Sequence, residues 1–299
     1  MARVLRAALA LRMALASEGT SVTQTAPHAF DDATRLVPAG EGRLRGTTSE
    51  AYWNFTGPFG GTTAATMLRA VLEQGRRAGD PVSITVNYAA PIARGDFDIA
   101  VREIRSNRST QHWYAELTQP EVGIAANATV VCAARPVTWA HQPATPPPAA
   151  APETLMVLPT QGMMAWLQRY EFRFVRNQPK PFGRTPNAEP GDALSHLWIG
   201  DRPARPVDFL ALTSYADTFF ARIFHVRGAL VPIGTVSMTV YFHADAAEVA
   251  AVGSGPVLGV SDGKSFSKGY SDQTVEMWSR DGRLLATSTQ LVYYRDPKG

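Results

Sequence analysis

The residues that first suggest chemistry in this sequence are Ser261 and the glycines around it. The stretch Gly259-Val260-Ser261-Asp262-Gly263 matches the Gly-x-Ser-x-Gly pattern of a serine nucleophile that performs acyl transfer. That pattern needs a strand–turn–helix context and, further along the chain, a histidine that accepts the serine proton. No histidine follows His243, and the residues after Gly263 lead into another strand-like run. We therefore interpret this motif as a turn.

Thiol and metal chemistry are no better supported. Cys132 is the single cysteine, and its apolar surroundings favour a buried small side chain over a nucleophile. One cysteine excludes a disulfide and a cysteine-based metal site within a monomer. The six histidines show no metal-ligand spacing. The sequence therefore predicts no metal and no cofactor.

Composition excludes further classes of protein. The net charge is only +3, and no basic run is long enough to line a nucleic-acid groove. No apolar run approaches the roughly 20 residues that cross a bilayer. Hydrophobic residues make up 45% of the chain, which is ample for a core. Any chemistry must then come from ordinary polar side chains, which the helices and strands of the fold must bring together.

The sequence repeats itself. Ser83-Ile84-Thr85-Val86-Asn87-Tyr88 returns as Ser237-Met238-Thr239-Val240-Tyr241-Phe242, at an offset of 154 residues in a chain of 299. A repeat on this scale indicates gene duplication and two similar modules packed against each other. Residues shared by the two halves then predict scaffold, and unmatched polar residues are candidates for chemistry.

Each half predicts one long helix followed by an antiparallel meander. In the first half, Ala64, Met67, Leu68, Val71 and Leu72 form an apolar stripe at helical spacing after Gly60-Gly61. Pro206 is suited to the first turn of the second helix, which we expect to run to about Val226. Strand-like runs are expected at residues 43–49, 82–89, 97–104, 111–118 and 123–133, and again at 166–175, 194–200, 233–243, 257–260, 268–279 and 284–294.

These elements predict an α+β fold with four parts. Residues 1–25 form an N-terminal extension, for which a transit peptide and a misassigned start upstream of Met13 fit equally well. Residues 26–140 form the first module, and residues 161–299 form the second. Residues 141–160 form a linker rich in proline and alanine, which cannot continue a sheet. The helix-plus-meander layout, made twice, is that of a double hotdog, in which each of two fused modules wraps a curved antiparallel sheet around a central helix.

A specific resemblance follows from the motifs in this order. Gly57-Pro58-Phe59-Gly60-Gly61 before the first helix resembles the helix start of the bacterial acyl-CoA thioesterase II family. In the second half, the segments Ser214-Tyr215-Ala216-Asp217, Thr235 to His243 and Asp281 to Gln290 are similar to the same family. The resemblance covers roughly residues 28–295 and implies a double-hotdog thioester hydrolase that acts on acyl-CoA without a cofactor.

The resemblance also implies a catalytic set. In that family hydrolysis depends on an Asp of the second helix, a Thr of the following strand and a Gln of the last strand, which fall here on Asp217, Thr235 and Gln290. Aligning the two halves places Val130 opposite Gln290, so the set is predicted once per chain. The sequence departs from the family at Ser237-Met238, where better-known members carry an Asp-His pair.

The physical case for these residues is simple. A carboxylate near Tyr215, Phe219 and Phe220 is partly desolvated, which raises its proton affinity and makes Asp217 a suitable base for a water molecule. The hydroxyl of Thr235 and the amide of Gln290 can hold that water in line. Backbone N–H groups at the start of the first helix can stabilise the oxyanion, and this assigns substrate binding to Phe59, Gly60 and Gly61. Arg108 is a further candidate, for a phosphate of coenzyme A.

Two other functions stay open. A non-catalytic hotdog protein that binds acyl-CoA or fatty-acyl groups would keep the fold without turnover. An acyl-thioester hydratase or dehydratase would use an Asp-His pair, which the sequence does not show in register. The expected partner is acyl-CoA, with no nucleic acid and no membrane, and with a homodimer formed through exposed sheet edges. We expect a cytoplasmic hydrolase of lipid metabolism.

Overall fold

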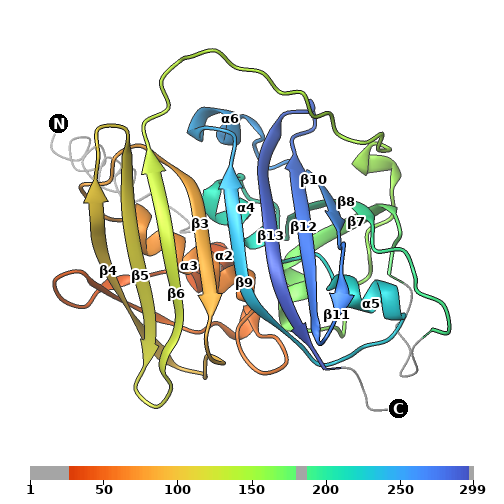
Figure 1. Cartoon of the computed structure of the whole chain (residues 1–299), viewed down its shortest axis with the longest axis horizontal. Helices are drawn as coiled ribbons and strands as arrows, with labels where there is room; N and C mark the ends of the chain where they lie inside the picture. The colour runs from red at the N-terminus through yellow and green to blue at the C-terminus, as the bar shows by residue number, and fades with distance from the viewer. Residues whose placement is uncertain (1–26, 180–186, 296–299) are drawn as a thin grey trace, which may run out of the picture.

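The computed structural model describes residues 27–179 and 187–295, so the predicted extension at residues 1–25 lies outside the described residues. A 13-stranded antiparallel sheet dominates the molecule, and α3 and α4 lie together behind it (Figure 1). Strand order is β1-β2-β4-β5-β6-β3-β9-β13-β12-β10-β8-β7, with β11 paired to β12. The sheet is therefore continuous across both halves of the chain.

The described residues of the first half form two α-helices and six strands. The long helix is α3 at Gly60–Leu72, and its predicted apolar stripe is buried. Three threonines of α3 are buried as well, and the hydroxyls of Thr63 and Thr66 are satisfied by backbone carbonyls one turn earlier. The other elements are α2 at Ala29–Ala33, β1 at Val37–Pro38, β2 at Arg43–Thr47, β3 at Asp80–Tyr88, β4 at Asp96–Ser106, β5 at Thr110–Gln119 and β6 at Gly123–Ala133.

In the second half, residues 152–179 and 187–295 form three α-helices and seven strands. The helices are α4 at Phe209–Tyr215, α5 at Arg222–Arg227 and α6 at Ala246–Ala251. The strands are β7 at Tyr170–Arg176, β8 at Ser195–Asp201, β9 at Ile233–Phe242, β10 at Val257–Asp262, β11 at Phe266–Ser267, β12 at Tyr270–Trp278 and β13 at Leu284–Tyr294.

Strand register shows that the repeated segments meet at the middle of the sheet. β3 pairs antiparallel with β9, and Thr85 lies opposite Thr239, its own counterpart in the repeat. Their hydroxyl oxygens are 3.0 Å apart. An approximate twofold axis therefore passes between these two threonines. On either side, β6 flanks β3 as β13 flanks β9, which places Val130 opposite Ile84 and Gln290 opposite Met238.

The predicted second helix is wrong over its middle. Helix α4 begins at its N-cap Asp208, whose side chain accepts the N–H of Ala211 at 2.7 Å, but it ends at Tyr215. A tight turn follows, in which the Thr218 hydroxyl donates to the carbonyl of Tyr215 at 2.7 Å. Threonine side chains that bond nearby backbone groups compete with the helical pattern. The chain becomes helical again only at α5, which ends at Gly228 with φ 64°.

One strand begins later than expected, and the linker between the two halves lies against the sheet. The strand expected at residues 166–175 begins only at Tyr170, because Ala165–Arg169 form a short 3-10 helix. Residues 134–151 contain no helix or strand, and they run against the second half of the sheet. There the Gln142 amide donates to the carbonyl of Gly282 at 2.9 Å, and the Trp198 indole donates to that of Ala150 at 2.9 Å.

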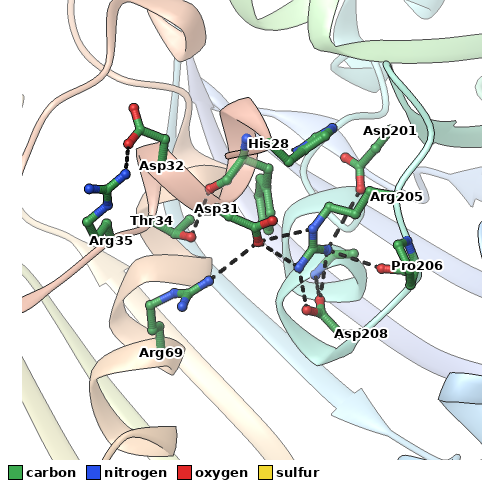
Figure 2. Close-up of polar contacts among 12 residues, drawn as sticks. His28, Asp31, Asp32, Thr34, Arg35, Arg69, Asp201, Arg205, Pro206 and Asp208 are labelled. Atoms are coloured by element: carbon green, nitrogen blue, oxygen red, sulfur yellow. Dashed lines mark hydrogen bonds and ion pairs between the residues drawn. The ribbon is translucent and has the colours of Figure 1, made fainter. Parts of the chain in front are cut away.

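Figure 2 shows a network of charged side chains that joins α2 to α3 and to the start of α4. Asp31 of α2 lies 2.9 Å from Arg205 and 3.7 Å from Arg69 of α3. Arg205 also pairs with Asp208 at the start of α4 at 2.6 Å, and lies 3.9 Å from the buried Asp201. The C-terminal part of α3 and the N-terminus of α4 are thereby held side by side, so the two helices run antiparallel.

Candidate active site

Asp217 lies where the N-terminus of α3 meets the turn after α4. Its carboxylate accepts the backbone N–H of Gly61, in the first turn of α3. The position is favourable for an anion, because the first N–H groups of a helix lack partners within the helix. The family resemblance placed this residue in a helix, but the structure places it in a turn two residues beyond the end of α4.

Gln290 lies beside Asp217. Its amide nitrogen is 3.1 Å from Oδ1 of Asp217, 3.1 Å from the carbonyl of Ala216 and 3.3 Å from Sδ of Met238. Gln290 is buried and faces inward from β13. Because the nitrogen faces three acceptors, the amide oxygen is left for another donor, such as a water molecule.

Burial raises the pKa of Asp217 to about 7, while the hydrogen bonds from Gln290 and from the Gly61 N–H lower it. A carboxylate with such a pKa is half-ionised near neutral pH, which suits a group that both takes and returns a proton. Perturbed titration in a partly exposed group points to a functional site, because burial and neighbouring groups shift pKa values most strongly where a side chain performs proton transfer.

The two glycines allow this close approach. A Cβ on Gly60 would lie 2.7 Å from Oδ2 of Asp217, and a Cβ on Gly61 would lie 2.5 Å from the carbonyl oxygen of Ser214 in α4. Any side chain at either position would push α3 away from α4 or from the carboxylate. Within the part of the chain that the structure describes, the N–H of Gly60 has no acceptor. It is a free donor next to the carboxylate.

Phe59 is the N-cap residue of α3 and is buried. Its ring stacks on Trp166 with centroids 4.2 Å apart, and it lies edge-on to Tyr170. This contact anchors the start of α3 against the second half of the chain. The structure thus brings Phe59, Gly60 and Gly61 together with Asp217 and Gln290.

Thr235 reaches the same face of the sheet through a β-bulge. Ser237 pairs with Leu291, but the next pair joins Thr235 to Val292, so Val236 is an extra residue in β9. The bulge turns Thr235 to the face that carries Met238 and Gln290. Among the hydrogen bonds of the described residues, none joins Thr235 to Asp217 or Gln290. Thr235 lies about 6–7 Å further along the sheet.

The structure does not bring Arg108 to this site. Arg108 is exposed in the hairpin between β4 and β5, at the end of the sheet where Asp80 begins β3. Asp217 lies near Tyr88, at the opposite end of β3. The sequence of a polar turn does not indicate at which end of the sheet that turn will lie.

Two polar residues near Asp217 were missed. Tyr88 donates to the carbonyl of Gly60 at 2.9 Å. Gln273, on β12, lies opposite Gln290 and is buried, and its amide nitrogen is 3.5 Å from the carbonyl of Phe219. The repeat would have revealed both, because the corresponding residues of the other half are Phe242 and Trp113, respectively.

Among the described residues, no group of three or more His, Cys, Asp or Glu side chains could hold a metal ion. None of the helices formed by those residues is both long and apolar enough to cross a membrane.

Two family models match this chain, and both describe domains of acyl-CoA thioesterases. The family model of the acyl-CoA thioesterase N-terminal domain matches residues 49–133, and that of the acyl-CoA thioesterase C-terminal domain matches residues 140–294. No protein of curated function matches the chain significantly.

Solved structures share the fold. A hot dog fold protein of unknown function from Alicyclobacillus acidocaldarius is 40% identical, with 91% of this chain and 100% of that chain covered and a TM-score of 0.85. The tesB protein of Mycobacterium avium subsp. paratuberculosis is 18% identical, with 90% and 100% covered and a TM-score of 0.72. An acyl-CoA thioesterase II of Mycobacterium marinum is 16% identical, with 90% and 99% covered and a TM-score of 0.70. The chain has the hotdog fold and belongs to the acyl-CoA thioesterase family.

Proposed function

We propose that this protein is an acyl-CoA thioesterase that hydrolyses acyl-CoA to a free acid and coenzyme A, on a double hotdog made of the two predicted modules. One observation carries the proposal: a half-buried carboxylate with a pKa of about 7, that of Asp217, lies at the start of α3 and is hydrogen-bonded by Gln290. Family membership and the hotdog fold of related structures support it.

The chemistry needs no covalent intermediate. Ionised Asp217 takes a proton from water as the water oxygen attacks the thioester carbonyl. The free amide oxygen of Gln290 accepts the other hydrogen of that water, and Thr235 borders the same space. The N–H of Gly60 stabilises the oxyanion, since it is an unused donor at a helix start. When the intermediate collapses, the C–S bond breaks and the departing thiolate receives the proton held by Asp217.

The proposal includes one active site per chain. The approximate twofold axis relates this site to the place where the C-terminal part of α3 passes the N-terminus of α4. There the charged network of Figure 2 fills the position, and Asp208 caps α4 itself. Val130 and Phe242 stand there in place of Gln290 and Tyr88. Neither a free helix start nor an amide remains for catalysis.

The test is free-thiol release across a panel of acyl-CoA chain lengths, with Asp217→Asn as the matched variant. We expect kcat to fall about 10²- to 10⁴-fold in the variant, because a positioned base contributes that much. Calorimetric binding of a non-hydrolysable thioether analogue should give one site per chain in both proteins. Tight binding without turnover by the native protein would instead favour a binding module.

The same panel addresses the lyase alternative. Hydration or dehydration of enoyl-CoA or hydroxyacyl-CoA changes the absorbance of the conjugated thioester without releasing thiol. Such a change, with no thiol release, would contradict the hydrolase proposal. A cytoplasmic location and the homodimer stay predictions of the sequence, and the homodimer is checked by light scattering of the purified chain.

A further inference from the structure

Tyr88 connects the first half of the chain to the carboxylate of the second. It is the last residue of β3, and its hydroxyl donates to the carbonyl oxygen of Gly60 at 2.9 Å. That carbonyl belongs to the peptide unit between Gly60 and Gly61. The N–H of the same peptide unit donates to Asp217. A single peptide group therefore lies between the tyrosine hydroxyl and the carboxylate.

Such a chain of hydrogen bonds is cooperative. A donor on the carbonyl draws electron density toward the oxygen and makes the N–H of the same peptide a stronger donor. It also fixes the plane of a peptide flanked by two glycines, which otherwise have wide conformational freedom. The carboxylate is thus bound by a polarised and oriented N–H group.

We propose that Tyr88 is a positioning residue, which holds the Gly60–Gly61 peptide in the orientation that binds and orients the Asp217 carboxylate. Its effect on catalysis rests on the proposed function, whereas its effect on the carboxylate does not. Neither family match assigns a role to this residue.

The approximate symmetry of the molecule supplies an internal comparison. Phe242 occupies the position of Tyr88 in the repeat, and it contacts the start of the other helix in the same way, edge-on to Phe209 with ring centroids 5.2 Å apart. An apolar ring is therefore sufficient to pack a strand end against a helix start. The start of α4 is capped by its own Asp208, whereas the start of α3 contacts Asp217 from the other half of the chain, and the hydroxyl of Tyr88 is present only beside α3.

No other charged group complicates the effect on Asp217. The elements around it present Gly60 and Gly61 from α3, Met238 from β9 and Gln290 from β13, none of which titrates. Tyr88 is the titratable neighbour, and burial together with the charge of Asp217 raises its pKa well above the usual value, so it remains protonated. Across the described residues, no lysine, arginine or histidine shifts the pKa of Asp217.

The experiment is Tyr88→Phe in the full chain, with the titration of Asp217 followed by carbon NMR of protein labelled at the aspartate carboxyl carbons. The Asp217 signal is identified by its loss in Asp217→Asn. We expect the midpoint in Tyr88→Phe to rise by roughly half a pH unit, because the carboxylate loses part of its stabilisation. The acid limb of kcat should move with it, so that kcat falls about 3-fold below the midpoint and recovers at high pH, with KM unchanged.

The matched control is Tyr215→Phe. It too removes a tyrosine hydroxyl, but the hydroxyl of Tyr215 donates to the carboxylate of Asp201 at 3.0 Å. The control should raise the midpoint of Asp201, whose pKa burial has raised to about 6, and leave that of Asp217 in place.

An Asp217 midpoint that is unchanged in Tyr88→Phe, or shifted equally in Tyr215→Phe, would overturn the inference. If the native protein hydrolyses no acyl-CoA, the proposed function fails, yet the NMR midpoints still decide the role of Tyr88. If hydrolysis is found but the midpoint does not move, the role of Tyr88 fails and the proposed function stands.

Discussion

At the scale of single residues, the site depends on one carboxylate that is costly to ionise. Asp217 is desolvated and has no cation beside it in the described part of the chain, so two hydrogen bonds offset only part of the cost. The same burial that suits Asp217 to the proposed role of a base makes its ionised form a burden on the fold. The proposed function therefore sets activity against stability at this residue.

This opposition predicts how stability changes with pH. The pKa of Asp217 is about 7 in the folded chain, above the ordinary value of 3.8, so the folded state keeps its proton over a range where the unfolded state has lost it. The free energy of unfolding should therefore fall as pH rises between these two values. Asp217→Asn has no charge to bury, so the melting temperature of this variant, relative to that of the native protein, should be higher at pH 8 than at pH 4.5.

Calorimetric scans at both pH values test this prediction. Asp192→Asn is the control, because hydrogen bonds lower the pKa of that exposed carboxyl below its ordinary value of 3.8. It is ionised in both the folded and the unfolded state from pH 4.5 to pH 8, so its melting-temperature difference from the native protein should not change over that range. A melting-temperature difference between native protein and Asp217→Asn that does not change with pH would contradict burial of the ionised group.

The resemblance to the thioesterase II family selected Asp217 and Gln290, but it gave no account of the contacts between them. Tyr88 and Gln273 escaped notice because tyrosine and glutamine are common in strands, and only the comparison of one half with the other marks them as unmatched. Arg108 was selected for its charge alone. Which edge of a sheet a hairpin occupies depends on strand order, which no local pattern encodes.

At the scale of elements, the site is a crossing of two helices made possible by glycine. The apolar stripe of α3 predicted a helix correctly, because its period reflects burial on one face. The break after α4 was not predicted, because Ala216 and Asp217 continue an acceptable helical pattern. The helix ends there because the Thr218 hydroxyl donates to the backbone carbonyl of Tyr215 and favours a turn.

The crossing predicts that Gly61→Ala destabilises the protein. The added Cβ would lie 2.5 Å from a backbone carbonyl of α4, which cannot move without moving the helix. We expect a loss of about 1–3 kcal/mol in the free energy of unfolding, as is typical of overpacking. Urea unfolding measures it, with Gly75→Ala as control, since a Cβ there meets nothing within 4 Å. Equal stability of the two variants would show that α3 and α4 can separate freely.

At the scale of the whole molecule, the charged network of Figure 2 joins parts that are far apart in the sequence. Arg205 is nearly buried and lies among three carboxylates, those of Asp31, Asp201 and Asp208. Removal of its guanidinium takes the ion-pair partner from Asp201 and Asp208 and leaves Asp31 with Arg69 alone. The network therefore contributes to the docking of α2 on both long helices.

Arg205→Met should accordingly lower the free energy of unfolding by about 3–5 kcal/mol, as expected when one partner of a buried ion network is lost. Arg280→Met is the control, because Arg280 pairs with Glu153 in solvent and such pairs contribute about 0–1 kcal/mol. Denaturant titration measures both variants. A loss in Arg205→Met no larger than that in Arg280→Met would show that the network does not hold the N-terminal segment.

The pairing of β3 with β9 joins the repeats within a single polypeptide. In an assembly of two identical subunits every inherited substitution appears on both sides of the axis, so neither copy can change alone. Here one gene encodes both sides separately, and a replacement at Tyr88 leaves Phe242 as it was. The two helix starts can therefore differ, with a polar chain of hydrogen bonds at one and a charged network at the other.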